Sequence, residues 1–269
     1  MSIILLGEAV HGVKQFWDYK LEFIKKNYSQ GRAFAVGFEA DELGIESLKH
    51  TNDIHEIILA FPKIMRTKQV YSIIEFCLTN KISIFGFDNR IRVSREKINK
   101  DLLYRAEIYT KIHNIHFGHK SYFAIRDSLM AKSIADFYSH AQKDLICLTH
   151  NLHIKKNGSE EKNEEIRLKS MREHLSDMEL SVRSVSIVAR EANFLETNLI
   201  KNRFIITDPS AVEMCIDGQD RLVIQPKDIE ANRCCYMFGC VKESQSAADS
   251  YDEVIVFDKV QEPNLLSLS

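Results

Sequence analysis

Four short apolar segments in the first 150 residues have the pattern of buried β-strands. They lie at residues 3–6, 34–38, 82–87 and 145–149. Each is almost continuously apolar, which is typical of parallel strands that are covered by helices on both faces. Because the segments between them carry apolar residues at helical spacing, strands and helices alternate along this part of the chain. The alternation predicts an α/β fold with a mostly parallel central sheet flanked by helices.

The same patterns outline the remaining elements. Helical spacing of apolar residues occurs over residues 14–28, 70–78, 92–115 and 122–138. Weaker strand patterns follow at residues 182–188, 204–206, 222–224 and 254–257. The polar run at 155–165 is expected to form an exposed loop. Because we find no repeat and no domain-scale linker, we expect residues 1–269 to form a single α/β domain with a helical insertion around residues 92–140.

Ionisable and polar side chains follow all four of the first strands. They are Glu8 and His11 after the first strand, Glu39 after the second, Asp88 after the third, and His150, Asn151 and His153 after the fourth. Ligands of open α/β sheets bind outside the carboxyl ends of the strands, so we expect an active crevice there. Carboxylates and histidines in one crevice shift one another's pKa values and can supply an acid or base near neutral pH. The alternative is that the acidic residues only cap the helices that follow.

A charged pair interrupts the predicted helix over residues 122–138. Arg126 and Asp127 stand within its otherwise apolar and amphipathic sequence. The planar guanidinium of Arg126 could reach a carboxylate or a developing oxyanion in the crevice. A surface ion pair is the alternative. A histidine-rich stretch at residues 113–119 follows no strand, and we expect it at the surface.

Charge, hydropathy and missing motifs narrow the classes of function. The formal net charge is −2 at pH 7, and no basic stripe is interleaved with aromatic residues, so we expect no nucleic-acid partner and no membrane partner. No apolar run approaches the roughly 18 residues of a membrane-spanning helix, and no signal-peptide pattern is present, so a cytoplasmic location is expected. The motifs of serine hydrolases, P-loop enzymes and thermolysin-type proteases are missing. A small-molecule substrate and a monomer or homodimer are the remaining expectations.

Taken in order, these motifs resemble those of the erythromycin esterase family, which is related to antibiotic resistance. The matching segments are GEAVHG at 7–12, EA at 39–40, GFD at 86–88, RDSLMA at 126–131 and HNLH at 150–153. Order and spacing agree over about residues 3–190. The resemblance implies a hydrolase that cleaves an ester or lactone, or an amide, without a metal or other cofactor.

The resemblance also implies roles for individual residues. The histidine of the opening motif acts as the general base on water, and here that histidine is His11. Glu8 and Glu39 would orient and polarise it, His150 or His153 would hold substrate or support the developing charge, and Arg126 would add positive charge. The candidate substrate-binding residues are Lys20, Asp88, Asp127, Asn151 and His153.

Several positions depart from the pattern of the family. Val10 stands where threonine is usual, Lys20 stands where arginine is usual, and the chain is shorter than the macrolide esterases. We therefore expect a substrate other than a macrolide. Two alternatives keep the same crevice. One is a divalent-metal hydrolase with ligands from Glu8, His11, Glu39 and His150. The other is a ligand-binding or biosynthetic accessory protein that hydrolyses nothing.

Overall fold

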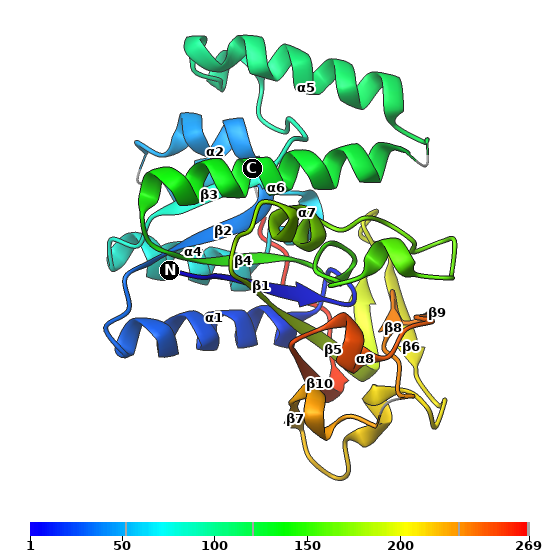
Figure 1. The fold of residues 1–269 in the computed structure, drawn as a ribbon. Coiled ribbons are helices and arrows are strands. Elements are labelled where there is room, and N and C mark those ends of the chain that lie inside the picture. Colours follow the sequence, from blue (N-terminus) through cyan, green and yellow to red (C-terminus); the bar gives the residue numbers. More distant parts are fainter. Residues whose placement is uncertain (52, 120, 231, 268–269) are drawn as a thin grey trace.

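A mostly parallel eight-stranded sheet forms the centre of the protein (Figure 1). The computed structural model describes residues 1–51, 53–119, 121–230 and 232–267. In spatial order the strands are β3 (Ile84–Asp88), β2 (Phe34–Asp41), β4 (Asp144–His150), β1 (Ile3–Glu8), β5 (Val182–Leu195), β10 (Glu253–Val260) and β7 (Arg221–Ile224), while β6 (Lys201–Ile205) pairs with β5. Only β6 and β7 pair antiparallel to their neighbours in this sheet. The predicted fold class is confirmed, and the four strands whose ends carry the candidate residues lie side by side.

Helices cover both faces of the sheet (Figure 1). One face packs against α1 (Lys14–Ser29) and α4 (Lys68–Thr79), and the other packs against α6 (Ser121–Ala141) and α7 (Met171–Asp177). Successive side chains of a strand point to opposite faces, so alternate residues of β1 belong to different apolar clusters. Ile4 and Leu6 join the cluster with α1 and α4, whereas Ile3 and Leu5 join the other.

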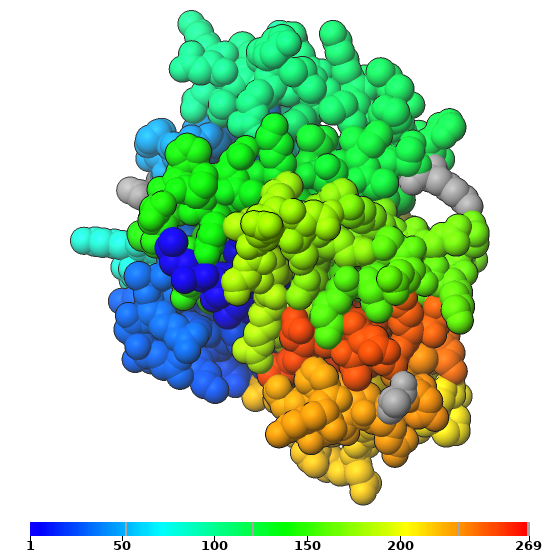
Figure 2. All heavy atoms as spheres, viewed as in Figure 1, coloured from blue at the N-terminus to red at the C-terminus, as the bar shows by residue number. Residues whose placement is uncertain are grey.

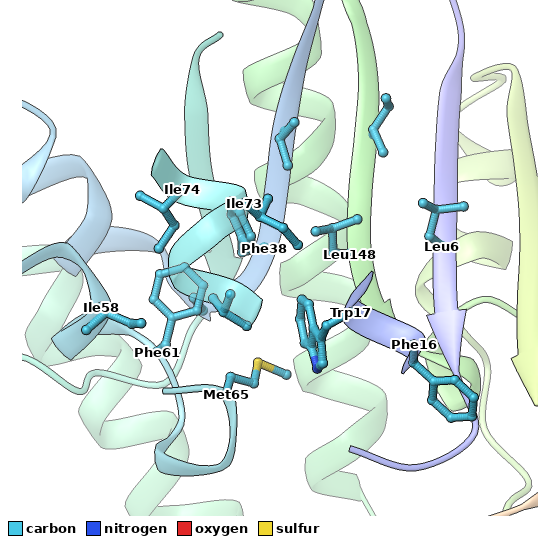
Figure 3. Close-up of a cluster of buried hydrophobic side chains, with 14 of the residues drawn as sticks. Leu6, Phe16, Trp17, Phe38, Ile58, Phe61, Met65, Ile73, Ile74 and Leu148 are labelled. Atoms are coloured by element: carbon cyan, nitrogen blue, oxygen red, sulfur yellow. The ribbon is translucent and has the colours of Figure 1, made fainter. Parts of the chain in front are cut away.

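The larger apolar cluster fixes the strands that carry the candidate site (Figure 3). Its members in the close-up are Leu6, Phe38 and Leu148 from the strands, and Phe16, Trp17, Ile58, Phe61, Met65, Ile73 and Ile74 from the elements below them. All ten side chains are almost fully buried. Burying one large apolar side chain stabilises a fold by roughly 1.5–3 kcal/mol, so this layer holds β1, β2 and β4 firmly in register.

The other elements lie around this framework. They are α2 (Glu42–Leu48), α3 (Ile54–Ile57), α5 (Leu103–His116), α8 (Ala247–Ser250), and the hairpin of β8 (Tyr236–Met237) and β9 (Val241–Lys242). In Figure 1 α5 lies outermost, beyond α6, and the arrow of β1 points toward the side on which β8 and β9 lie. Within the described residues, no helix combines the length and apolar character needed to cross a membrane.

The predicted helix over 92–115 starts later than the sequence indicates. The helix begins only at Leu103, and the segment before it contains two short 3-10 turns. The backbone amides of Arg92 and Val93 donate to Oδ2 of Asp41, at 2.6 and 3.2 Å. Because a distant carboxylate already holds these two amides, the chain leaves β3 in an extended path. Asp41 also caps α2 by accepting a hydrogen bond from the Gly44 amide, so for this acid the capping alternative is correct.

The polar run at 155–165 is a largely exposed loop, as its composition predicts, but two of its charged side chains are buried. Lys155 is fully buried, and its Nζ lies 2.5 Å from Oε2 of Glu161, which is itself buried. Glu161 also accepts a hydrogen bond from the backbone amide of Ser244. In the space-filling view this part of the chain, in yellow-green, packs directly on the orange-red C-terminal part (Figure 2). Lys155 and Glu161 pair inside the protein, whereas Glu160, Lys162, Glu164 and Glu165 are exposed.

Candidate active site

His11 lies in the loop after β1 and is held by the last residue of that strand. Its Nδ1 atom is 2.8 Å from Oε1 of Glu8. Glu8 is fully buried, while 19% of the His11 side chain is exposed. An ionised carboxylate can only accept a hydrogen bond, so this contact places a proton on Nδ1. Among the described residues Glu8 is the only hydrogen-bond partner of the ring, and Nε2 therefore keeps a lone pair for a molecule in the crevice.

Lys20 donates a hydrogen bond to the second carboxylate oxygen of Glu8. Its Nζ atom lies 2.8 Å from Oε2 of Glu8, 3.4 Å from the carbonyl oxygen of Thr149 and 4.1 Å from the ring centroid of Trp17. Burial lowers the pKa of Lys20, although the Glu8 carboxylate acts in the opposite direction. The side chain has no solvent exposure. Lys20 is thus paired with Glu8 and closed to solvent, whereas the sequence predicts a direct contact with substrate.

Arg126 joins the ends of β2 and β3. Its Nη2 donates to Oε1 of Glu39 at 2.6 Å, and its Nε donates to Oδ1 of Asp88 at 2.9 Å. The other oxygen of Asp88 accepts a hydrogen bond from Arg92 at 2.8 Å. Burial alone would raise the pKa of Glu39, but Arg126 and then His153 outweigh it and hold that pKa well below the usual range. Burial likewise opposes the charge of Asp88, yet Arg126 and Arg92 lower its pKa to about 2.

The depressed pKa of Asp88 predicts a loss of stability in acid. The carboxyl has a pKa of 3.8 when unperturbed and about 2 in the folded protein. Its contribution is therefore fully present above pH 3.8 and is lost as the pH falls through about 2. The shift corresponds to about 2 kcal/mol. We expect urea unfolding between about pH 5 and pH 2 to show a shallower pH dependence for Asp88→Asn than for the natural protein. Parallel curves for the two proteins would contradict this assignment.

Glu39 connects β2 to β4 through its second oxygen. Oε2 accepts hydrogen bonds from Oγ1 of Thr149 at 2.8 Å and from the backbone amide of His150 at 3.1 Å. Together with Arg126, these contacts engage both oxygens of the carboxylate. Glu39 therefore influences His11 through its charge, and no hydrogen bond between the two side chains occurs in the described part of the chain.

His150 has both ring nitrogens engaged by the main chain. Nε2 donates to the carbonyl oxygen of Ala9 at 2.9 Å, and Nδ1 accepts a hydrogen bond from the amide of Leu152 at 3.1 Å. Burial, followed by positive charge on His11 and His153, lowers the pKa of His150 well below its usual value. The neutral ring lies beside His11, with 4.9 Å between the ring centroids and 62° between the planes. This arrangement favours a positioning role for His150 over the predicted catalytic one.

His153 is held by Asp127, which comes from α6. Nδ1 lies 2.8 and 2.9 Å from the two oxygens of Asp127, and Nε2 faces Nη1 of Arg126 at 3.1 Å and Oε1 of Glu39 at 3.6 Å. Burial opposes a charge on His153, but Asp127 and Glu39 outweigh it and raise the pKa to about 9. A neutral ring accepts a hydrogen bond from Arg126, whereas a protonated ring donates to Glu39. Asp127 is fully buried, so it orients His153 and does not face the crevice.

Asn151 packs beneath the strand ends. Its Nδ2 donates to Oγ of Ser186 at 2.8 Å, and the residue is buried. A Cβ atom built on Gly7 would lie 2.4 Å from Oδ1 of Asn151, so the close approach of the two segments requires glycine at position 7. Asn151, like Lys20 and Asp127, was predicted to bind substrate, but the structure places all three behind the residues that reach the crevice.

The sequence analysis missed Phe238, which covers the site from the tip of the β8–β9 hairpin. Its ring stacks on His150 with 4.8 Å between centroids, and its amide donates to the carbonyl oxygen of Ala9 at 3.0 Å. The backbone reaches positive φ at Phe238 and again at Gly239, which forms the tight turn. Because no motif surrounds Phe238, only the folded chain shows that it belongs to the site.

A cavity of about 410 Å³ lies beside this network. It is bounded in part by Lys63 and Ile64, by Arg90 and Arg92 after β3, and by Tyr109 and His113 of α5. His11 is not among the described lining residues, but Ile64 connects the cavity with its loop. A Cβ atom built on Gly12 would lie 2.9 Å from Cδ1 of Ile64. The cavity therefore adjoins the loop that carries His11. His113 belongs to the histidine-rich stretch that the sequence places at the surface.

The donor atoms do not fit the metal-dependent alternative. Glu8 is engaged by His11 and Lys20, both oxygens of Glu39 are engaged, and both nitrogens of His150 bind the main chain. No cluster of three or more His, Cys, Asp and Glu side chains suited to a metal ion occurs within the described ranges. A metal at this place would have to displace several buried hydrogen bonds.

Solved structures with the same fold support the expected architecture. A mutant of erythromycin esterase EreC in its open conformation has a TM-score of 0.74 and 13% identity, over 99% of this chain and 92% of that chain. The chain has the fold of an erythromycin esterase. A Bacillus cereus protein gives 0.72 and 14% over 99% and 90% of the two chains, and a succinoglycan biosynthesis protein gives 0.71 and 12% over 98% and 89%. Neither a protein-family model nor a curated protein sequence matches this chain.

Proposed function

We propose that this protein with the erythromycin esterase fold is a hydrolase that cleaves an ester, lactone or amide bond of a small molecule. The observation that carries the proposal is the Glu8–His11 pair. A buried carboxylate fixes the proton of the ring on Nδ1, while Nε2 is left without a protein partner at the accessible edge of the site. This is the arrangement that a histidine general base requires. The likeness of the fold to erythromycin esterase EreC supports the same reaction class.

In the proposed reaction His11 activates a water molecule. Nε2 accepts a proton from water as the oxygen bonds to the carbonyl carbon, and the carbonyl electron pair moves onto its oxygen. When the tetrahedral intermediate collapses, the bond to the leaving oxygen or nitrogen breaks, and His11 returns its proton to the leaving group. Glu8 stabilises the positive charge that His11 carries between these two steps. Lys20 holds the second oxygen of Glu8 and thereby fixes the orientation of the carboxylate.

Several further features belong to the same proposal. The reaction requires no metal ion or other cofactor, because water is activated by a side chain. The substrate is a small molecule other than a macrolide, and the protein acts in the cytoplasm as a monomer or homodimer, without a nucleic-acid or membrane partner. The likeness to a succinoglycan biosynthesis protein supports the alternative of a biosynthetic accessory protein, whose crevice would bind a ligand without turnover.

The test is hydrolysis of a panel of 4-nitrophenyl esters and small lactones by the natural protein, with and without a chelator. We expect turnover of at least one compound, with the same rate after chelation and no initial burst of nitrophenol. Loss of the rate with chelator would overturn the metal-free mechanism. A burst equal to the enzyme concentration would indicate a covalent acyl-enzyme and overturn direct attack by water. Ligand binding without turnover of any compound would favour the accessory protein.

A further inference from the structure

The cavity beside the candidate site carries positive charge on its lining and no negative charge. Lys63, Arg90 and Arg92 line it, and no Asp or Glu is among its described lining residues. A further cation, Arg66, is near enough to Arg92 for that charge to lower its pKa, after the larger effect of burial. Three positive groups on a concave lining create a potential that attracts anions. We call this space the cationic cavity.

The protein neutralises these charges only in part. Arg92 pairs with Asp88, which Arg126 also contacts, and Arg126 has a second partner in Glu39. Lys63, Arg66 and Arg90 form no ion pair with any residue in the described ranges. Lys63 is exposed, but Arg66 and Arg90 are half-buried, and these unpaired guanidinium groups favour an anionic ligand.

The guanidinium of Arg90 is fixed in an orientation that allows it to bind such a ligand. Its Nε donates to Oη of Tyr122 at 2.7 Å, and its guanidinium carbon lies 5.2 Å from the centroid of the Tyr122 ring. The hydroxyl of Tyr122 is in turn 2.9 Å from Nδ1 of His113. These contacts fix the plane of the guanidinium, while its two terminal nitrogens have no hydrogen-bond partner among the described residues. A planar fork with two such donors binds a carboxylate or phosphate in a bidentate manner.

The rest of the lining suits the apolar part of a small molecule. Pro62, Ile64 and Ile91 contribute apolar surface. The volume of about 410 Å³ falls within the range of small-molecule sites, which is roughly 300–1,000 Å³. The side chain of Ile64 lines the cavity and also meets the loop of His11, so the cavity adjoins that loop.

We propose that the cationic cavity binds an anionic group of the substrate, a carboxylate or a phosphate, while the scissile bond lies at His11. This inference rests on the proposed hydrolase and names its substrate class as acidic esters or lactones. Neutral analogues lose the contacts with the fork of Arg90, and cationic analogues are repelled by it, so the cavity selects by charge.

The kinetic test compares two esters of equal chain length, mono-4-nitrophenyl adipate and 4-nitrophenyl hexanoate. We expect the natural protein to prefer the adipate in kcat/KM, and Arg90→Gln to reduce that preference about 10- to 100-fold, mainly through KM for the adipate. Arg95→Gln is the matched control, because Arg95 is 68% exposed and lies outside the cavity. An equal loss for both esters, or no preference in the natural protein, would overturn the charge selection.

A binding test separates this inference from the proposed hydrolase. Calorimetry with adipate, inorganic phosphate and neutral adipamide needs no turnover. Binding of either anion that weakens with salt and is lost in Arg90→Gln supports the cationic cavity even if no ester is hydrolysed. The stronger of the two anions identifies a carboxylate or a phosphate as the natural group. If neither anion binds while 4-nitrophenyl hexanoate is hydrolysed, the cavity assignment is wrong and the hydrolase stands.

Discussion

Replacing His11 by glutamine is expected to reduce kcat by about 10²- to 10⁴-fold, which is the usual contribution of a general base. The reason is that glutamine can occupy the same space and contact Glu8, but it cannot accept a proton from water at neutral pH. The side chain of His11 is partly exposed and makes one hydrogen bond in the described structure, so the fold should be retained. Steady-state hydrolysis of the best ester in the panel measures the loss, and circular dichroism checks the fold.

The matched control for His11 is His140→Gln, at the exposed end of α6. Within the described residues, His140 forms hydrogen bonds only with residues of its own helix, so this variant should keep full activity. Unchanged turnover in His11→Gln would contradict the mechanism. A fall in activity with loss of the circular dichroism spectrum would instead show that His11 is needed for folding.

Replacing Arg126 by methionine is expected to lower the free energy of unfolding by about 3–5 kcal/mol. Arg126 donates to both Glu39 and Asp88, and His153 is a weaker cationic partner of Glu39 at 3.6 Å. Methionine fills much of the volume but leaves the buried Glu39 carboxylate with His153 alone. The loss should be read from urea unfolding at neutral pH.

Two comparisons make this stability test specific. Arg95→Met removes an exposed ion pair with Glu107 and should cost no more than about 1 kcal/mol. The difference between Arg126→Met and the natural protein should also shrink as the pH falls, because protonation of Glu39 and Asp88 removes the uncompensated charges. A difference that is small at neutral pH, or that does not depend on pH, would contradict the account of Arg126 as the partner of buried carboxylates.

The sequence was sufficient to predict the parallel sheet and the gathering of the candidate side chains at one edge of it. Buried parallel strands are continuously apolar, so their ends can be read directly, and Glu8, Glu39, Asp88 and His150 all follow such ends. The order of the strands could not be read, but parallel strands place their carboxyl ends together in any order. This is why the clustering could be predicted without the topology.

The different roles of the individual site residues could not be predicted from the sequence. His150 and His153 stand in the same short motif, yet the nitrogens of His150 bind backbone groups of Ala9 and Leu152, which any residue type could supply. The burial of Lys20 depends on which strand α1 packs against, and the sequence does not show that strand. The cationic cavity combines residues near positions 63, 91 and 113, and no local pattern connects them. Contacts between distant segments decide these features, and single-sequence patterns report only local preferences.

The strand order determines when the strand that carries Glu8 can pair during synthesis of the chain. In the finished sheet β1 lies between β4 and β5, so neither neighbour of β1 exists until more than half of the chain has been synthesised. A nascent chain that ends before Asp144 cannot pair the strand that carries Glu8, and Lys20 loses the carbonyl of Thr149. Pairing between strands that are far apart in the sequence is slow, because the chain loses entropy on closing the loop before the stabilising contacts form. Chains that stop before Asp144 are therefore left without the strand pairing that positions Glu8 beside His11.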